Sequence, residues 1–249
     1  MIEPDRPYSL GWPEAYGSRG VRQRIAKLNA LWPLRGRRLL DVGCGNGSYT
    51  TEMAAGFDEI FGIEIEPDRL RAFRQHLDAA TGPSSETSKF RLAEMSVEAL
   101  DFPDCFFDVV TAIEVIEHIV DDSEAAGQIY RVLNPGGAFL ITAPNRWFPI
   151  ETHSFKIRGQ ERRSKRWPFV PWVKPLHRRI STARNYRTPD LDRLLVPHGF
   201  TRVGIDYLMP PLERNRIGRF LRPATDALDR TPLKTFGVSI VAAYMKPPS

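Results

Sequence analysis

Near the start of the chain, a short apolar segment runs directly into a glycine-rich loop. Residues 38–42 are Arg-Leu-Leu-Asp-Val, and the next five residues include Gly43, Gly45 and Gly47. A helical pattern follows over residues 48–55. Glycine adopts backbone angles that other residues avoid, and it has no side chain to keep a ligand away from the backbone. We therefore predict a strand, a ligand-binding loop and a helix, with a nucleotide-like ligand lying across the loop.

Strand patterns and helix patterns alternate through the first half of the chain. The predicted strands cover residues 38–42, 59–65, 90–92, 108–113 and 138–142, and the predicted helices cover residues 21–31, 48–55, 67–79 and 122–133. Because parallel strands need crossover connections, this order predicts a parallel sheet covered on both faces. The expected fold class is α/β, doubly wound, with residues 21–142 as the core that binds the cofactor.

The sequence changes character after Pro144. Residues 147–187 are rich in Pro, Trp, Phe and Arg without a regular period, so we interpret them as an inserted cap on the acceptor side. Regular patterns return in residues 188–249, which predict a helix over 188–196 with Thr188 as its N-cap, strands over 202–208 and 238–245, and an irregular amphipathic helix within 211–230. We expect one domain spanning residues 1–249.

Composition narrows the class of protein. The chain is 42% hydrophobic and 26% charged, which is ordinary for a globular protein, and no window approaches the roughly 20 apolar residues of a membrane helix. Residues 1–20 lack the layout of a secretory signal, so a cytoplasmic location is expected. The two cysteines, Cys44 and Cys105, lack metal-binding spacing, and we expect free thiols and no structural zinc.

The spacing in the glycine loop indicates which kind of ligand it binds. The dinucleotide pattern G-x-G-x-x-G/A, counted from Gly43, places its third small residue at Ser48, whereas Gly47 makes this loop G-x-G-x-G. Asp41 adds a carboxylate at the end of the strand. This charge would repel a pyrophosphate and attract an ammonium or sulfonium group. The sequence therefore favours a cofactor that carries an amino acid.

Four motifs together resemble the class I S-adenosylmethionine-dependent methyltransferases, especially the branch that includes the ubiquinone-biosynthesis methyltransferases. They lie within residues 39–142 in the expected order: LLDVGCGNG at 39–47, FGIEI at 61–65, FDVV at 107–110 running into EVIEH at 114–118, and RVLNPGG at 131–137. The resemblance implies a Rossmann-like, mostly parallel sheet with an antiparallel last strand. It also implies S-adenosyl-L-methionine as the cofactor.

The resemblance assigns cofactor contacts to the loop and to the ends of the second and fourth strands. Glu64 ends the second strand, where a carboxylate accepts both ribose hydroxyls. The other implied contacts are Asp41 and Gly43 near the methionine part, Cys44 as a small loop residue against the cofactor, Gly45 and Gly47 at bare backbone, Ile65 on the adenine, and Ala112 and Ile113 beside the transferred methyl group.

One position departs from the family pattern. Ser96 and Val97 fall where relatives usually carry an acidic residue that contacts the adenine amino group. Two explanations stay open. A hydroxyl or a water takes over this contact, or a slip of one or two residues makes Glu94 or Glu98 the counterpart.

His118 is the first candidate for a catalytic group. It lies four residues after Glu114, so a helical turn would place both on one face and let Glu114 orient the imidazole. A base near the methyl group is useful when the acceptor is a hydroxyl, because oxygen becomes nucleophilic as it loses its proton. The alternative is that His118 caps or packs the following helix.

Glu151 and His153 are the second candidates. They follow the fifth predicted strand, where open α/β sheets bind their ligands, and a similar PN-FPIE-H stretch occurs in a subset of related methyltransferases. The two residues either act on the acceptor or order the cap. Two candidate ligands are too few for a metal site, so we predict no metal.

The net charge of +5 is concentrated in the cap. Basic and aromatic residues are interleaved there: Lys156, Arg158, Arg162, Arg163, Lys165 and Arg166 beside Trp167, Phe169, Pro171 and Trp172. This mixture suits an anionic membrane surface, a phosphorylated acceptor or nucleic acid. The alternative is a solvated loop stabilised by prolines.

By family analogy, we predict methyl transfer to a small-molecule or lipid-like acceptor, with O-methylation as the commonest chemistry. RNA or protein methylation through the basic cap is the second hypothesis. The chain has no recognisable RNA-binding module, which argues against nucleic acid. A non-catalytic protein that binds S-adenosylmethionine is the third hypothesis.

Overall fold

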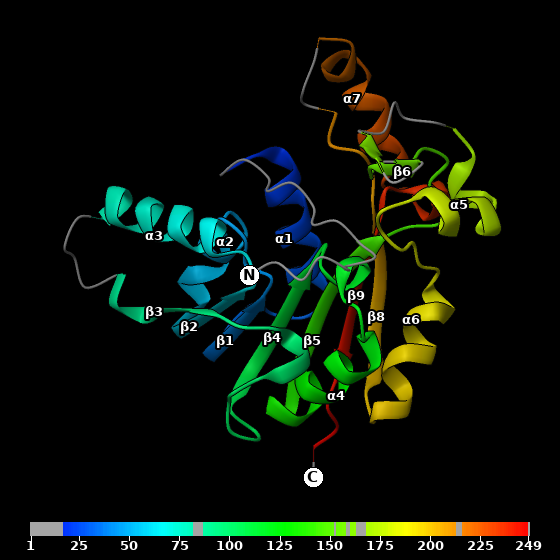
Figure 1. The fold of residues 1–249 in the computed structure, drawn as a ribbon. Coiled ribbons are helices and arrows are strands. Elements are labelled where there is room, and N and C mark those ends of the chain that lie inside the picture. The colour runs from blue at the N-terminus through cyan, green and yellow to red at the C-terminus, as the bar shows by residue number, and fades with distance from the viewer. Residues whose placement is uncertain are drawn as a thin grey trace.

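A computed structural model describes residues 17–81, 87–151, 153–157, 160–162, 168–212 and 216–248 (Figure 1). Its main sheet has seven strands in the order β3-β2-β1-β4-β5-β9-β8. These strands are β1 (Gly36–Val42), β2 (Phe57–Glu64), β3 (Phe90–Glu94), β4 (Phe107–Ile113), β5 (Leu133–Pro144), β8 (Thr201–Leu208) and β9 (Ser239–Met245). Strand β9 is antiparallel to both its neighbours, and the other pairs are parallel. The predicted doubly wound α/β fold with an antiparallel last strand is confirmed.

Helices cover both faces of this sheet. They are α1 (Arg19–Leu31), α2 (Thr50–Met53), α3 (Pro67–Thr81), α4 (Asp122–Val132), α5 (Lys174–Ile180), α6 (Thr188–Leu195) and α7 (Arg216–Leu228). Leu28 of α1 and Met53 of α2 belong to one buried cluster, whereas Ile129 of α4 and Leu195 of α6 belong to another. Helix α3 packs on β2 and β3. The sheet is therefore sandwiched between two helical layers.

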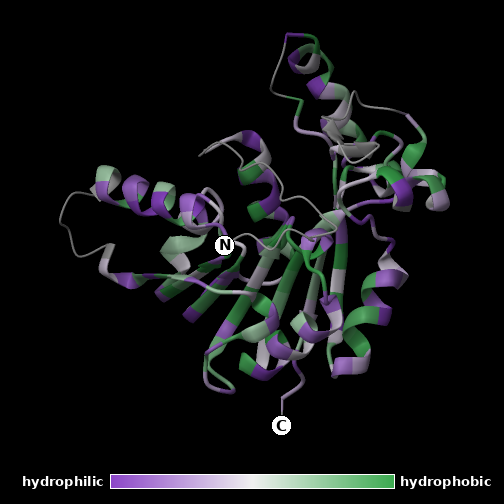
Figure 2. Cartoon of the chain, in the orientation of Figure 1, coloured by the Kyte–Doolittle hydropathy of each residue, from purple (hydrophilic) through white to green (hydrophobic). Residues whose placement is uncertain are grey.

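Strand β5 shows how the sheet separates these two clusters. Phe139 and Ile141 are fully buried on the side of α4 and α6, and Ala138 and Leu140 are fully buried on the side of α1 and α2. Side chains alternate across a strand, so a strand buried on both faces is apolar throughout. In Figure 2 the strands are mainly hydrophobic, whereas α3 mixes hydrophilic with hydrophobic residues. Among the residues that the structure describes, no helix is both long and apolar enough to span a bilayer.

The start of α6 differs from the prediction. Thr188 is the first residue of the helix, and Arg187 is its N-cap. The backbone N–H of Arg187 donates to Asp190 Oδ2 at 2.8 Å. The Thr188 hydroxyl instead lies 3.0 Å from the Tyr207 hydroxyl on β8. The prediction was wrong because this tertiary contact occupies the side chain that was expected to cap the helix.

The predicted cap contains short regular elements that its sequence did not reveal. The strands β6 (Phe155–Ile157) and β7 (Gln160–Arg162) form a hairpin, and α5 follows a 3-10 turn over Val170–Trp172. Strands of three residues are too short to show a period. Figure 1 shows β6, α5 and α7 gathered beyond one end of the sheet.

Most of the basic residues that were predicted to form a surface on the cap lie outside the part of the chain that the structure describes. Arg158, Arg163, Lys165, Arg166 and Trp167 lie outside the described residues, and only the backbone is described for Lys156 and Arg162. Within the described part, the aromatic residues Phe169 and Trp172 are 55% and 43% exposed, while Pro171 is buried. The cap therefore presents apolar surface at these two rings.

Asp108 joins the beginnings of two strands. Its Oδ2 accepts from the backbone N–H groups of Arg37 and Arg38 at 2.7 and 2.9 Å, and its Oδ1 accepts from Asn134 Nδ2 at 2.8 Å. We expect Asp108→Ala to lower the free energy of unfolding by about 2 kcal/mol, because hydrogen bonds to a charged group contribute roughly 1.5–3 kcal/mol. Urea unfolding followed by circular dichroism measures this change.

The control for this prediction is Asp104→Ala. Asp104 is 73% exposed at its side chain and pairs with Arg131 at the surface. Exposed ion pairs contribute up to about 1 kcal/mol, so the control should lose clearly less stability. Equal losses in the two variants would contradict the role given to Asp108.

Candidate functional site

The glycine loop lies at the carboxyl ends of β1 and β2. Gly43, Gly45 and Gly47 all have positive φ, at 65°, 56° and 86°. A Cβ at Gly47 would lie 2.2 Å from the ring of Phe73, so only glycine fits there. A Cβ at Gly45 would meet only a backbone oxygen at 4.0 Å. The loop therefore has no room for a side chain at Gly47, whereas there is free space beside the backbone of Gly45, which is itself a buried residue.

Cys44 lies between these glycines and faces the protein interior. Its backbone N–H donates to the carbonyl of Ile63 at 3.0 Å, which ties the loop to β2. The side chain is buried against Leu70 and Phe73 of α3, and this burial raises the pKa of the thiol well above its usual value. The thiol is therefore a packing group rather than a nucleophile.

Asp41 is 2% exposed at the end of β1. Its Oδ2 accepts from the Thr50 hydroxyl at 2.6 Å, and its Oδ1 accepts from the Thr111 hydroxyl at 2.7 Å. Burial raises the pKa of Asp41 to about 6, although both hydroxyls act in the opposite direction. The two threonines had not been singled out, because the contacts join residues on β1, α2 and β4 that only the fold brings together.

Glu64 is buried beside the glycine loop. Its Oε2 accepts from the backbone N–H of Gly45 at 3.1 Å, and its Oε1 accepts from the N–H groups of Ile65 and Glu66 at 2.8 and 3.1 Å. These bonds fix the carboxylate between the loop and the end of β2. Carboxylate oxygens have about four acceptor sites in total, so one further donor can still be accommodated here.

Ser96 and Val97 lie just after β3. Val97 is buried in the core, and Ser96 is the N-cap of a 3-10 turn, where its hydroxyl donates to Glu98 Oε2 at 3.0 Å. Glu98 Oε1 in turn accepts from the N–H of Asp121 at 2.8 Å. Glu94 ends β3 in register with Glu64. Glu98 is thus engaged with protein groups, whereas the Glu94 side chain is exposed.

Ala112 and Ile113 end β4, next to β1. Ala112 is fully buried and pairs in register with Val42, immediately before the glycine loop. The next residue, Glu114, has a positive φ of 56° and accepts from the Thr142 hydroxyl at 2.9 Å. The prediction that Glu114 orients His118 was wrong, because this turn breaks the helical spacing on which it depended.

Glu117, rather than Glu114, is the carboxylate that lies near His118. A 3-10 turn over Ile116–His118 places Glu117 in the interior with its side chain 0% exposed. Glu117 Oε1 lies 3.8 Å from His118 Nε2 and 3.9 Å from His153 Nε2. Burial raises the pKa of Glu117 well above its usual value, and nearby Glu114 adds to the effect. The two predicted histidines are therefore brought together around a carboxylate that the sequence analysis had overlooked.

Glu151 contacts His153 at Nδ1, the ring nitrogen that does not face Glu117. Glu151 Oε1 lies 3.2 Å from His153 Nδ1, and Glu151 Oε2 lies 2.7 Å from Nε2 of His177 on α5. Burial favours the neutral acid, but the bonds from the two histidines outweigh it and lower the pKa of Glu151 to about 2. His177 was also overlooked, since it lies in a stretch without periodicity. Its proximity to Glu151 depends on how the cap folds back.

Comparisons with known proteins agree with this geometry. Residues 40–141 match the family described as "Methyltransferase domain". The ubiquinone biosynthesis O-methyltransferase of Psychrobacter arcticus is 29% identical over 206 residues, which cover 81% of this chain and 74% of that protein. The same enzyme of Paracidovorax citrulli is 34% identical over 49% of this chain and 50% of its own length. An S-adenosylmethionine-dependent methyltransferase from Mesorhizobium loti has the same fold, with a TM-score of 0.61 and 17% identity over 88% of this chain and 96% of its own.

The domain match over residues 40–141, the curated relatives and the shared fold together support a class I S-adenosylmethionine-dependent methyltransferase. Its cofactor is S-adenosylmethionine. The phosphoethanolamine N-methyltransferase 2 of Haemonchus contortus, solved with S-adenosyl-L-methionine, shares the fold at a TM-score of 0.61 and 18% identity over 91% of this chain and 52% of its own. The free space beside Gly45 and the buried carboxylates of Asp41 and Glu64 fit a ligand that carries a sulfonium, an ammonium and ribose hydroxyls.

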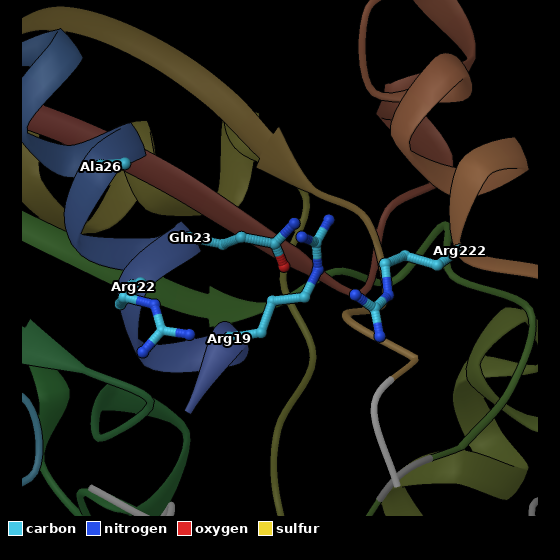
Figure 3. Close-up of a pocket in the computed structure, with 5 residues that line it drawn as sticks. All are labelled: Arg19, Arg22, Gln23, Ala26 and Arg222. Atoms are coloured by element: carbon cyan, nitrogen blue, oxygen red, sulfur yellow. The ribbon is translucent and has the colours of Figure 1, made fainter. Parts of the chain in front are cut away.

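A separate hollow of about 360 Å³ lies between α1 and α7 of the methyltransferase. It is lined by Arg19, Arg22, Gln23, Ala26 and Arg222, and Figure 3 shows Arg19, Gln23 and Arg222 extending into the space between the two helices. Arg19 pairs with Asp226. No residue expected to contact the cofactor lines this hollow, so we do not assign it to the cofactor.

The raised pKa of Asp41 gives the methyltransferase a pH-dependent stability. The folded state binds this proton more tightly than the unfolded state, so the contribution of Asp41 is fully present below about pH 4 and is lost as the pH rises through about 6. At roughly 1.4 kcal/mol per pKa unit, the loss is about 3 kcal/mol. We expect Asp41→Asn to remove this part of the pH dependence, as measured by urea unfolding at several pH values between 4 and 8.

The exposed Asp101→Asn serves as the control and should leave the pH dependence of the wild type unchanged. If Asp41→Asn and the wild type lost stability in parallel over this range, the assignment to Asp41 would be wrong.

Proposed function

We propose that this methyltransferase transfers the methyl group of S-adenosylmethionine to a hydroxyl oxygen of a small-molecule or lipid-like acceptor. The observation that carries the proposal is the group formed by Glu117, His118, Glu151 and His153 at the carboxyl ends of β4 and β5. Imidazoles and carboxylates at this position suit an acceptor whose oxygen must lose a proton. The O-methyltransferase names of the relatives support the same chemistry.

The proposed cofactor site uses the residues around the glycine loop. Glu64 accepts a ribose hydroxyl at its remaining acceptor position, and Asp41 attracts the positive charge of the methionine part without touching it directly. Gly43, Gly45 and Gly47 give the cofactor access to the backbone, with Cys44 packed behind them. Ile65 packs on the adenine, with Ser96 and Val97 at its far edge, and Ala112 and Ile113 border the transferred methyl group.

The proposed reaction is an in-line displacement. The acceptor oxygen forms a bond to the methyl carbon while the bond from carbon to sulfur breaks, and its electron pair stays on sulfur. Alignment of two bound reactants can remove roughly 7–11 kcal/mol of the barrier, so positioning by the loop and the cap supplies most of the acceleration. His118 and His153, the latter oriented by Glu151, favour the ionised form of the acceptor oxygen. A cap that closes over the site would also exclude water.

Replacement of Glu64 tests the cofactor half of this proposal. We expect Glu64→Gln to weaken the binding of S-adenosylmethionine at least about tenfold, because a charged acceptor of a ribose hydroxyl is lost. Isothermal titration calorimetry measures the affinity, with NAD as the control ligand. The exposed Asp68→Asn on α3 is the control variant and should bind like the wild type.

Unchanged affinity in Glu64→Gln, or a preference for NAD, would contradict the assignment. Thermal unfolding of both variants in parallel separates a loss of binding from a loss of structure.

The acceptor class is tested with radiolabelled methyl donor. The protein is incubated with methyl-labelled S-adenosylmethionine and separate pools of phenols, lipid extracts, RNA and protein. We expect label in the organic-extractable products, as an O-methyl group identified by mass spectrometry. Label in RNA or protein would overturn the proposed acceptor, and no transfer to any pool would favour a non-catalytic binding protein.

A further inference from the structure

The starting observation is a buried carboxylate without a hydrogen bond. The Glu117 side chain is 0% exposed, and neither of its oxygens has a hydrogen-bond partner among the described residues. Burial of an unpaired carboxylate is costly, and proteins normally avoid it through a partner, a bound cation or protonation. The other buried acids of the site, Asp41, Glu64 and Glu151, all have donors within 3.2 Å. The positive charge of Arg24 acts on Glu117 from nearby, but no described side chain donates a hydrogen bond to either Glu117 oxygen, so both oxygens can still take a ligand.

Two histidines near Glu117 are of a residue type that binds metal ions. One oxygen of Glu117, one ring nitrogen of His118 and one of His153 lie within 4.8 Å of one another. The distances from Glu117 Oε1 to the two Nε2 atoms are 3.8 and 3.9 Å. Two ligand atoms on a tetrahedral ion with bonds of 2.0–2.1 Å lie roughly 3.4 Å apart. The two distances from Glu117 would therefore contract by about half an ångström on binding, and the two histidines, which lie within 4.8 Å of each other, would move closer together as well.

A further layer of side chains already orients one of these ligands. Glu151 accepts from His153 Nδ1–H, which leaves the lone pair of Nε2 directed toward Glu117. The second oxygen of Glu151 is held by His177 at 2.7 Å. A histidine that binds a metal almost always donates its other nitrogen to a carboxylate or carbonyl in this way. Glu151 and His153 lie at the start of the cap and His177 lies on α5, so this support belongs to the folded cap.

We propose that Glu117, His118 and His153 bind one divalent transition-metal ion, with Zn²⁺ the best match, and leave a coordination position for the acceptor oxygen. The proposal rests on the proposed O-methylation. Two imidazoles and one carboxylate are a ligand set of catalytic zinc sites, which keep a position open. The ion would lower the pKa of a bound hydroxyl. The proton leaves to solvent, the oxygen lone pair forms the bond to the methyl carbon, and the sulfonium becomes a neutral thioether.

A metal at this site differs from the expectation that the sequence contains no metal site. That expectation counted only Glu151 and His153. In the structure Glu151 is the supporting residue rather than a ligand, and Glu117 and His118 arrive from a different strand end. The ligand set therefore combines the EVIEH motif with the segment after β5, which are separated by a whole strand and helix in the sequence.

The test measures metal binding directly. The full-length protein is treated with a chelator, dialysed and titrated with Zn²⁺ by calorimetry and with Co²⁺ by visible absorption. We expect one ion per chain, with the absorption of four- or five-coordinate Co²⁺. Glu117→Gln and His153→Ala should each weaken binding at least tenfold. His177 contacts Glu151 but none of the three metal ligands. His177→Ala should weaken metal binding roughly 10- to 100-fold, because Glu151 would no longer orient His153 as firmly.

His198→Ala is the matched control, because His198 lies near Ser123 and away from the cluster, and it should bind the metal like the wild type. S-adenosylmethionine affinity is measured on the same samples and should persist in Glu117→Gln, which shows that the variant is folded. If the wild type did not bind S-adenosylmethionine, the proposed function would be overturned rather than the metal site.

No stoichiometric binding of Zn²⁺ or Co²⁺ by wild-type protein that still binds the cofactor would overturn the metal proposal. Equal metal affinity in the wild type, Glu117→Gln and His153→Ala would do the same, since the ion would then bind elsewhere. In either case Glu117 would be a protonated, neutral acid in the interior.

Discussion

Parallel pairing of β1 with β2 and β4 brings the carboxyl ends of these strands to one edge of the sheet, and both halves of the site depend on this arrangement. The glycine loop follows β1, Glu64 ends β2, and Glu117 lies one turn beyond β4. Strand β5 extends the same edge and leads into the cap. Most residues of β4 and β5 and the carboxyl-terminal residues of β1 and β2 are buried, so a slip in the register of these strands would disrupt the packing of the core. The positions of the site residues are thus set by core packing.

Four acids are buried along this edge, and the protein stabilises each of them differently. Asp41 accepts from two threonine hydroxyls, Glu64 accepts from three backbone N–H groups, and Glu151 is held by two imidazoles. Glu117 has no comparable donor among the described residues. A buried carboxylate is costly when it is charged and unpaired. This concentration of negative charge favours cationic ligands, which matches a sulfonium cofactor and a divalent ion.

The fold was predictable from the sequence because its signals are local or periodic. The alternation of strand and helix patterns gave the parallel sheet, and the apolar run in β5 reflects burial on both faces. Errors arose where a side chain has a distant partner. Thr188 lies against Tyr207 instead of capping its helix, and Glu114 turns to Thr142 instead of His118. Neither contact leaves a trace in the spacing of nearby residues.

The sequence by itself determined the sheet and the glycine loop, because these follow from residue types at short, regular spacing, and its resemblance to a known family indicated the cofactor. Only the tertiary structure decided that His118 and His153 meet around Glu117 and that His177 supports Glu151. These residues come from separate segments, and a carboxylate in a motif looks the same whether it is solvated or buried. Burial and distance give such a group its chemistry, and both arise only when the chain is folded.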